Sequence, residues 1–340
     1  MRTADFDYEL PAELIAQQPP DERDAARMMV LDQSGGTLDR TVGDLPRYLE
    51  TGDVLVLNDS RVLPARLIGR RRDGGEAEVL LLRPLPEGTH RWEALIRPAR
   101  RLGVGSRVKF ENSALAVSVE GRDGETATVR LNGVADPLAE VRRIGQMPTP
   151  PYIKERLRDR ERYQTVYARA EGSAAAPTAG LHFTPALLSA LRNRGVAIAF
   201  VTLHVGLDTF RPVRVDDAVE HRIHREWYRI DEDTARAINE ARRLGKRVVA
   251  VGTTSVRVLE SAAHDKGVTA GEAWTSLFIL PGYRFRVVDA MLTNFHLPKS
   301  TLLMMVSAFA GRDRILAAYA RAIERRYRFY SFGDCMLISP

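Results

Sequence analysis

The sequence contains one cysteine, Cys335, among its 340 residues. A single thiol excludes an intramolecular disulfide and any metal site built from four thiolates. The sequence also lacks a run of about 18 apolar residues that would span a membrane, and it lacks the basic-then-apolar segment of a signal peptide. These absences predict a cytoplasmic protein with no membrane partner.

Charge of one sign is only mildly in excess, since 50 lysine and arginine residues stand against 44 aspartate and glutamate residues and give a net charge of +6. The basic residues are spread over short clusters at 70–72, 97–107, 192–194, 242–247 and 324–328. Such clusters are typical of a folded surface that meets a polyanion such as RNA. An arginine-rich composition without any binding role explains the excess equally well.

Short β-like runs follow one another from residue 54 to residue 131, separated by Gly, Asp and Asn at intervals of roughly ten residues. This pattern predicts a small antiparallel β-barrel or sandwich. The proline-rich segment 145–153 then forces extended backbone and marks a domain boundary. We therefore expect a large domain formed by 1–58 and 152–340, with a β-barrel domain inserted at 59–151.

Helices and strands alternate in the second half of the chain. The helix at 185–195 is marked by the N-cap Thr184, a face of leucines and a closing Gly195, and the helix at 231–245 by acidic residues in its first turn. The expected helices are 185–195, 231–245, 255–267, 300–311 and 312–327, and the expected strands are 196–206, 246–252, 274–282 and 328–338. Such alternation predicts an α/β domain with a mainly parallel sheet, open or barrel-like, whose chemistry lies in loops at the strand ends.

Histidines are concentrated at the predicted strand ends and loops. Those singled out are His182, His204, His221, His224 and His296. Because the free pKa of histidine is about 6.5, such a group suggests proton transfer or metal binding. A hydrogen-bonded structural histidine is the alternative at each position.

His221 and His224 are three residues apart and precede Glu226, so a helical turn would present them on one face. A zinc site needs three or four ligands, and this segment lacks the H-E-x-x-H order. A role in orienting substrate hydroxyls or in bracing a loop is therefore favoured over metal binding.

Two further segments carry polar groups at element boundaries. In "VAVGTTSVRVLE" a strand enters a helix through Gly252, Thr253 and Thr254, and the free backbone N–H groups of that helix start suit a carboxylate or phosphate. A capped helix without a ligand explains this segment almost as well. In "NDSRVLPAR" Asp59 and Arg61 stand where the insert begins, either lining a cleft or fastening the junction.

Long motifs also run in order along the whole chain. They include "GDVLVLNDSRVLPARLIG", "GSAAAPTAGLHFT", "FVTLHVGLDTFRPV", "HRIHRE", "VVAVGTTSVRVLE" and "PGYRFRVVDAMLTNFHLPKSTLLMMVSAFAG". These motifs resemble those of the S-adenosylmethionine:tRNA ribosyltransferase-isomerases of queuosine biosynthesis. The sequence departs from the family pattern at Cys335, where alanine is common, and at Val258, where threonine is common. Asp208 falls in a variable pair, which makes it a poor catalytic candidate.

The resemblance implies a large α/β domain with an inserted β-barrel and a tRNA-modifying activity. Enzymes of this family transfer the ribosyl group of S-adenosylmethionine to 7-aminomethyl-7-deazaguanine at the tRNA wobble position. Rearrangement gives epoxyqueuosine, with release of adenine and methionine. S-adenosylmethionine is then a consumed co-substrate, and no metal, other cofactor or DNA partner is expected. Whether the enzyme is a monomer or a dimer stays open.

The implied reaction needs a proton acceptor, a proton donor for adenine and a pocket that excludes water. For proton transfer we expect His182 first, supported by His204 and His296. For substrate binding we expect the following residues: Thr253, Thr254 and Arg257 at the methionine carboxylate, Phe183, Phe210 and Phe295 at the adenine or sulfonium, and Asn294, His221, His224, Asp59 and Arg61. Packing in the core is the alternative for each phenylalanine.

An anticodon loop is recognised through splayed bases and stacking, with affinity from phosphate contacts. The expected RNA-binding residues are Arg97, Arg100, Arg101, Lys154 and Tyr163. Two other functions stay open at this point. One is a metal-dependent hydrolase on a barrel-like α/β scaffold that uses the five histidines as ligands, and the other is a non-catalytic RNA-binding protein.

Overall fold

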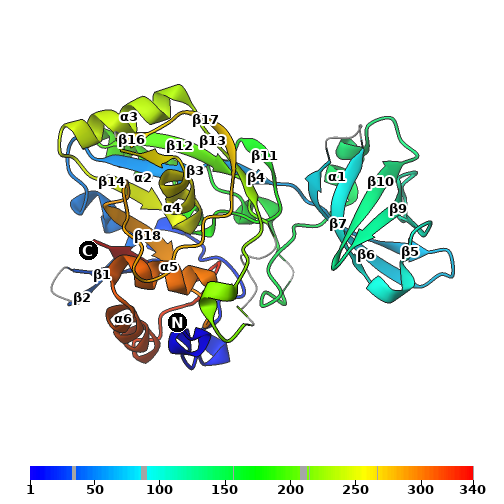
Figure 1. Ribbon diagram of the computed structural model, residues 1–340, viewed down its shortest axis with the longest axis horizontal. Helices are drawn as coiled ribbons and strands as arrows, with labels where there is room; N and C mark the ends of the chain where they lie inside the picture. The colour runs from blue at the N-terminus through cyan, green and yellow to red at the C-terminus, as the bar shows by residue number, and fades with distance from the viewer. Residues whose placement is uncertain are drawn as a thin grey trace. The chain divides into compact units, whose positions relative to one another are not determined.

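A computed structural model describes residues 1–32, 36–85, 90–155, 157–206, 213, 215–265 and 267–339. The chain divides into two compact units, shown in Figure 1. The larger comprises Met1–Ser60, Pro151–Ala170 and Ala176–Pro340, and the smaller comprises Arg61–Pro150 and Glu171–Ala175. The smaller unit is therefore an insertion in the larger one.

The larger unit is built on a sheet of nine strands within the described ranges. In spatial order they are β17 (Gly271–Thr275), β13 (Glu226–Ile230), β12 (Ala197–Leu203), β3 (Val54–Asn58), β14 (Val248–Val251), β18 (Ala290–Asn294), β19 (Cys335–Ile338), β1 (Arg27–Leu31) and β2 (Thr37–Thr41). The central strands β12, β3, β14 and β18 are parallel, as are β19 and β1. The other pairs are antiparallel.

Helices flank this sheet (Figure 1). They are α2 (Pro185–Asn193), α3 (Glu232–Arg243), α4 (Gly252–Ser261), α5 (Thr301–Ala310) and α6 (Arg312–Glu324). Short 3₁₀ helices span Thr3–Phe6, Ala12–Leu14, Arg23–Ala25, Val42–Arg47, Arg160–Tyr163, Thr178–His182 and Ala218–Glu220. A two-stranded ribbon joins β15 (Ala263–His264) to β16 (Gly267–Val268). No helix in the described ranges has the length and apolar character needed to cross a membrane.

Helix α2 illustrates how local sequence produces the fold. Thr184 caps the helix, because its hydroxyl accepts a hydrogen bond from the Leu187 N–H at 3.1 Å, and Pro185 occupies the first helical position. The buried face of α2 packs with alternate residues of the neighbouring strands in one apolar core. Members of that core are Leu187, Leu188, Leu191, Leu55, Leu57, Val249, Val251 and Leu292.

The smaller unit is a closed antiparallel barrel in the order β10-β7-β6-β5-β8-β9. Its strands are β5 (Arg66–Arg71), β6 (Glu76–Pro84), β7 (Arg91–Arg97), β8 (Arg107–Lys109), β9 (Ala116–Asp123) and β10 (Thr126–Asn132). Strand β10 alternates strictly between buried and partly exposed residues, as a barrel wall requires. The 3₁₀ helix Ala99–Arg101 follows β7, and helix α1 (Pro137–Ile144) follows β10.

The expected α/β class with an inserted antiparallel barrel is confirmed. Residues 171–175, which the sequence analysis placed in the large domain, belong to the barrel unit, because β11 (Ala170–Ser173) pairs with β4 (Ser60–Val62). The strand expected at 274–282 is wrong in its extent, since β17 ends at Thr275. This strand lies at the sheet edge and is mostly exposed, so its apolar content is low, whereas the apolar run that follows it is a loop.

Candidate active site

The chemistry-bearing motifs converge at one edge of the large sheet. Strands β3, β12, β14 and β18 are parallel neighbours, so their carboxyl ends meet at the same edge. Strand β19 begins at this edge as well, because Cys335 is paired with Asn294 at the end of β18. The segments that follow or precede these ends therefore lie together, although they are far apart in the sequence.

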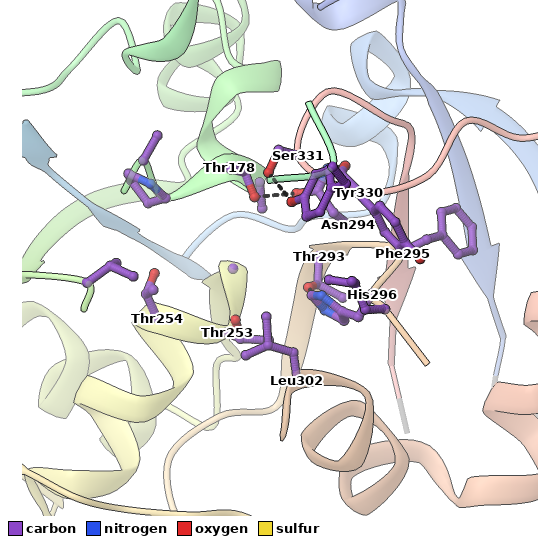
Figure 2. Close-up of a pocket in the computed structure, with 17 residues that line it drawn as sticks. Thr178, Thr253, Thr254, Thr293, Asn294, Phe295, His296, Leu302, Tyr330 and Ser331 are labelled. Atoms are coloured by element: carbon purple, nitrogen blue, oxygen red, sulfur yellow. Dashed lines mark hydrogen bonds between the residues drawn. The ribbon is translucent and has the colours of Figure 1, made fainter. Parts of the chain in front are cut away.

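A hollow of about 540 Å³, counted out to its open mouth, lies at this edge. Figure 2 shows Thr178, Asn294 and Tyr330 at one side of it and Thr253 and Thr254 at another. The residues that line it are Tyr152, Ala176, Pro177, Thr178, Ala179, Val205, Gly252, Thr253, Thr254, Thr293, Asn294, Phe295, His296, Leu297, Leu302, Tyr330 and Ser331. We call this hollow the first pocket.

The first turn of α4 forms one wall of the first pocket. The helix begins at Gly252, whose φ of +81° is a left-handed conformation that favours glycine, and it has no side-chain cap. Its first backbone N–H groups lack intrahelical partners and carry the positive end of the helix dipole. The Thr254 hydroxyl is buried and has no hydrogen-bond partner in the described part of the chain. This wall therefore offers several donors to an oxygen-bearing ligand.

Asn294 links several segments beneath the first pocket. Its amide nitrogen donates to the backbone oxygen of Tyr330 at 3.2 Å and lies 3.3 Å from Nε2 of His182. Its Oδ1 accepts a hydrogen bond from the Thr178 hydroxyl at 3.2 Å. The side chain is therefore fixed by partners from two parts of the sequence, the 3₁₀ helix Thr178–His182 and the segment at Tyr330.

His182, the histidine expected to act first, is not among the residues that line the first pocket. It lies at the end of the 3₁₀ helix Thr178–His182 and is only 2% exposed. Burial, followed by the charges of Arg328 and Arg23, lowers the pKa of His182 to about 4, so the ring is neutral at pH 7. Its ring contacts the pocket-lining residue Asn294.

His296 does line the first pocket, directly after strand β18. Its Nε2 lies 2.8 Å from the hydroxyl of Thr293. Its backbone is held on both sides, since the N–H donates to the hydroxyl of Tyr319 at 2.9 Å and the carbonyl accepts from the hydroxyl of Tyr8. Burial lowers the pKa of His296 to about 3. The ring is thus neutral at pH 7, and the backbone that carries it is held by hydrogen bonds on both sides.

His204 lies beside the first pocket, where its neighbour Val205 forms part of the lining. Its ring packs on Trp227 with centroids 4.9 Å apart, and its Nε2 is buried with no partner among the described residues. Burial lowers the pKa of His204, and a hydrogen bond with the backbone of Ala170, followed by the charge of Asp59, partly offsets this effect. His204 is therefore close to the site without lining it.

Asp59 follows β3 and is almost fully buried. Its carboxylate accepts a hydrogen bond from Thr202 at 2.7 Å and is paired with the guanidinium of Arg169. Asp59 and Arg61 are assigned to different units. These contacts give Asp59 a structural role, because they tie the end of β3 to Thr202 and Arg169.

Arg257 does not join Thr253 and Thr254 in the first pocket, although it lies on the same helix. It lines a second pocket, together with Gly206, Ile223, His224, Glu226, Leu277, Phe278, Ile279, Thr301, Leu302 and Met305. Arg257 is ion-paired with Glu226, and both side chains are 6% exposed. His221 packs on Phe278 with ring centroids 5.5 Å apart. The helical turn expected for His221 and His224 is wrong, because residues 221–225 form no helix.

Of the three phenylalanines expected at the adenine or sulfonium, one is buried away from the first pocket, one borders it and one lies outside the described residues. Phe183 is fully buried in the core beneath α2, which removes it from the pocket. Phe295 borders the first pocket, but its ring packs among Tyr319, Tyr327 and Phe329. Phe210, like Asp208, lies outside the described residues. Core packing thus accounts for both described phenylalanines.

The expected RNA-binding residues fall into an exposed group and a buried one. Arg97, Arg100 and Arg101 are exposed on the barrel unit, and Lys154 is exposed on the larger unit. Tyr163 is fully buried and packs edge-on against Phe332, with ring centroids 5.7 Å apart. Its ring is therefore not available to stack on a base.

The sequence analysis missed several residues that line the first pocket. They are Tyr152, Thr178, Thr293, Tyr330 and Ser331. The hydroxyls of Tyr152 and Ser331 are 2.7 Å apart, and the rings of Tyr152 and Tyr330 have centroids 4.8 Å apart. Tyr152 lies in the proline-rich segment 145–153, and Thr178 and Thr293 lie within the quoted motifs. Tyr330 and Ser331 fell inside the strand expected at 328–338, which is wrong in its extent because β19 begins only at Cys335. Within the described ranges, no three His, Cys, Asp or Glu residues are grouped to hold a metal ion.

Comparison with known proteins identifies the family. The model of the family described as queuosine biosynthesis protein matches residues 3–338. A protein named S-adenosylmethionine:tRNA ribosyltransferase-isomerase from Symbiobacterium thermophilum is 55% identical, covering 99% of this chain and 100% of that protein. A protein of the same name from Moorella thermoacetica is also 55% identical, with the same coverage.

A solved structure gives the same result. The crystal structure of S-adenosylmethionine tRNA ribosyltransferase from Thermotoga maritima is 39% identical in sequence, with a TM-score of 0.57. The match covers 98% of this chain and 99% of that one. The chain therefore belongs to the S-adenosylmethionine:tRNA ribosyltransferase-isomerases, a family of queuosine biosynthesis proteins.

Proposed function

We propose that this protein transfers the ribosyl group of S-adenosylmethionine to tRNA and isomerises it to give epoxyqueuosine. The acceptor is the aminomethyl group of 7-aminomethyl-7-deazaguanine at the wobble position of the anticodon, and adenine and methionine are released. The observation that carries the proposal is the first pocket, whose walls come from the motifs that the chain shares with its family. The two alternatives, a metal-dependent hydrolase and a non-catalytic RNA-binding protein, find no support among the relatives.

The reaction begins at the ribose carbon next to the sulfonium, whose positive charge acidifies the attached hydrogens. We assign the proton-accepting role to His296, because it is the histidine that lines the first pocket. Its neutral ring can accept a proton directly, but a pKa of about 3 makes it a weak base. The acidity of the carbon must therefore come largely from the sulfonium beside it.

The start of α4 suits the later steps. Loss of adenine and attack by the substrate amine lead to an alkoxide on the former ribose, which closes the epoxide as methionine departs. A developing oxyanion is stabilised by preorganised donors in a site that excludes water. The first N–H groups of α4 and the Thr254 hydroxyl are donors of this kind. We assign them to this oxygen rather than to the methionine carboxylate.

His182 then has a positioning role. It contacts Asn294, and Asn294 fixes Thr178 at the pocket wall. A protonated ring at His182 would be unable to accept a hydrogen bond from the Asn294 amide. Its lowered pKa keeps this contact intact across the neutral range.

For tRNA binding we propose the exposed arginines of the barrel unit, Arg97, Arg100 and Arg101, together with Lys154. Guanidinium groups bind phosphate in a bidentate manner and supply most of the salt-dependent affinity for RNA. We also propose that S-adenosylmethionine is consumed as a co-substrate, that no resident cofactor is needed, and that the protein acts in the cytoplasm. These last points stay predictions.

The experiment that tests this function measures free adenine after S-adenosylmethionine is mixed with the protein and tRNA that carries the precursor base. We expect adenine, methionine and modified tRNA in equal amounts, with no effect of a chelator. A His296→Gln variant should lower turnover by about 10²-fold or more, the usual scale for loss of a general base. A His182→Gln variant should lower it less, since Gln can still accept from Asn294.

Two outcomes would contradict the proposal. If the wild-type protein releases no adenine with S-adenosylmethionine and precursor tRNA, the proposed activity is wrong. Wild-type turnover in the His296→Gln variant leaves the activity in place but removes His296 from the proton transfer.

A further inference from the structure

The second pocket contains a buried ion pair with unused hydrogen-bonding capacity. Arg257 and Glu226 both line it, and both are buried. A charged pair of this kind is costly to bury unless its remaining donors and acceptors are satisfied. Its contacts therefore indicate what else belongs in the pocket.

Arg257 lacks one partner. Its Nε donates to the backbone oxygen of Leu277 at 3.2 Å, and its Nη1 donates to Oε2 of Glu226. Its Nη2 is buried and has no partner in the described part of the chain. An unsatisfied donor on a buried guanidinium is destabilising, and the described residues supply no acceptor at this position, so a ligand acceptor, best an anionic one, fits there.

The carboxylate of Glu226 can accept a further hydrogen bond. Its Oε1 accepts a hydrogen bond from the Gly206 N–H at 2.8 Å, and its Oε2 accepts from Arg257. A carboxylate has about four acceptor positions, so described residues occupy about half of them. A ligand ammonium group can share this carboxylate.

The charges of the pair cancel, which favours a ligand that also carries both charges. A ligand with only a carboxylate or only an ammonium would leave one charge of the pocket unbalanced. The remaining walls are largely apolar, formed by Leu277, Phe278, Ile279 and Met305. Such walls suit a short hydrocarbon or thioether chain.

The second pocket adjoins the first. Leu302 lines both, and α4 contributes Thr254 to the first and Arg257 to the second. Three residues of helix advance about 4.5 Å along the axis. In methionine the sulfur stands three bonds from the α-carbon, so one molecule can span from the first pocket to the second.

We infer that the second pocket binds the zwitterionic α-amino acid end of the donor, with Arg257 on its carboxylate and Glu226 on its ammonium. The sulfonium and the ribose then lie in the first pocket. This inference rests on the proposed function for the identity of the donor. It adds Glu226 as a binding residue, and it gives Arg257 a different ligand group from the one bound by the first turn of α4.

The test compares three ligands for the full-length protein by calorimetric titration without tRNA. S-adenosylmethionine carries both charges of the amino acid, decarboxylated S-adenosylmethionine lacks the carboxylate, and 5′-methylthioadenosine lacks both. We expect Arg257→Met to weaken S-adenosylmethionine binding about tenfold or more, the scale of a hydrogen bond to a charged group, and to leave decarboxylated S-adenosylmethionine within about twofold. Glu226→Gln should weaken both and spare 5′-methylthioadenosine.

Two further variants distinguish a loss of ligand contacts from a loss of folding. The double variant Arg257→Met/Glu226→Gln leaves no unpaired buried charge and keeps an acceptor for the Gly206 N–H, and it should lose discrimination among the three ligands. Arg243→Met is the matched control, because Arg243 is ion-paired with Glu240 on the exposed face of α3. It should change none of the three affinities.

Each failure is distinguishable. If Arg257→Met weakens all three ligands equally, or leaves S-adenosylmethionine binding unchanged, the second pocket does not hold the amino acid end. If the variants change the three affinities as expected but the wild-type protein releases no adenine with precursor tRNA, the pocket assignment stands and the proposed function fails.

Discussion

His182 and His296 lie in the interior of a protein whose substrate is charged, and burial determines their chemistry. Removal of water disfavours the imidazolium form, which lowers both pKa values far below the ordinary value of about 6.5. Both rings are therefore hydrogen-bonding groups at neutral pH and not cations. A neutral pocket also avoids repulsion of the sulfonium.

The same pKa shifts predict how stability depends on pH. Between about pH 4 and pH 6.5 the unfolded chain binds a proton at each of these histidines and the folded chain does not, so the free energy of unfolding decreases as the pH falls. Each histidine contributes about 1.4 kcal/mol per pH unit in this window. Urea unfolding at pH 7 and pH 5.5 should show a smaller change for His182→Gln than for the wild type. An equal change in both proteins would mean that His182 is protonated in the folded state.

At the scale of the element, the start of α4 depends on one glycine. Alanine at position 252 would meet no close atom, since Ala179 Cβ lies 3.5 Å from the site of the new Cβ, but the φ of +81° is unfavourable for any side chain. We expect Gly252→Ala to lower the free energy of unfolding by about 1–2 kcal/mol. It should also lower turnover about tenfold or more, because the first N–H groups of α4 would be displaced.

Gly245→Ala is a matched control. Gly245 follows α3, has a φ of +66° and has open space where a Cβ would stand. The two variants should lose similar stability in urea unfolding, whereas only Gly252→Ala should lose turnover. Wild-type turnover in Gly252→Ala would remove the helix start from the reaction.

Elements with strong local signals were predictable from the sequence, and those defined by pairing were not. Helix α2 begins at the proline that follows Thr184, as the capping pattern indicates. Strands β13 and β17 pair with each other at the sheet edge, and their partly polar sequences carry no apolar run. Likewise, strand ends revealed His296 and Asn294, but only the fold shows that His182 stands behind Asn294 and that Arg257 faces Glu226.

At the scale of the whole molecule, the chain devotes one unit to the pocket and another to a closed barrel with exposed arginines. We expect the logarithm of the tRNA association constant to fall linearly with the logarithm of salt concentration. The double variant Arg100→Ala/Arg101→Ala should reduce that slope by about one to two and leave S-adenosylmethionine affinity unchanged. Filter binding between about 50 and 200 mM salt measures the slope. An unchanged slope would place the RNA on another surface.

The single cysteine has a practical consequence. Cys335 begins strand β19, between β18 and β1, and its thiol is fully buried, which raises its pKa. Thiol reagents attack the thiolate, so the folded chain should be inert toward them until the sheet opens. The rate of Cys335 labelling therefore reports how often the sheet opens. A cysteine introduced on the surface can be labelled without background, which allows fluorescent probes on the barrel unit to report tRNA arrival.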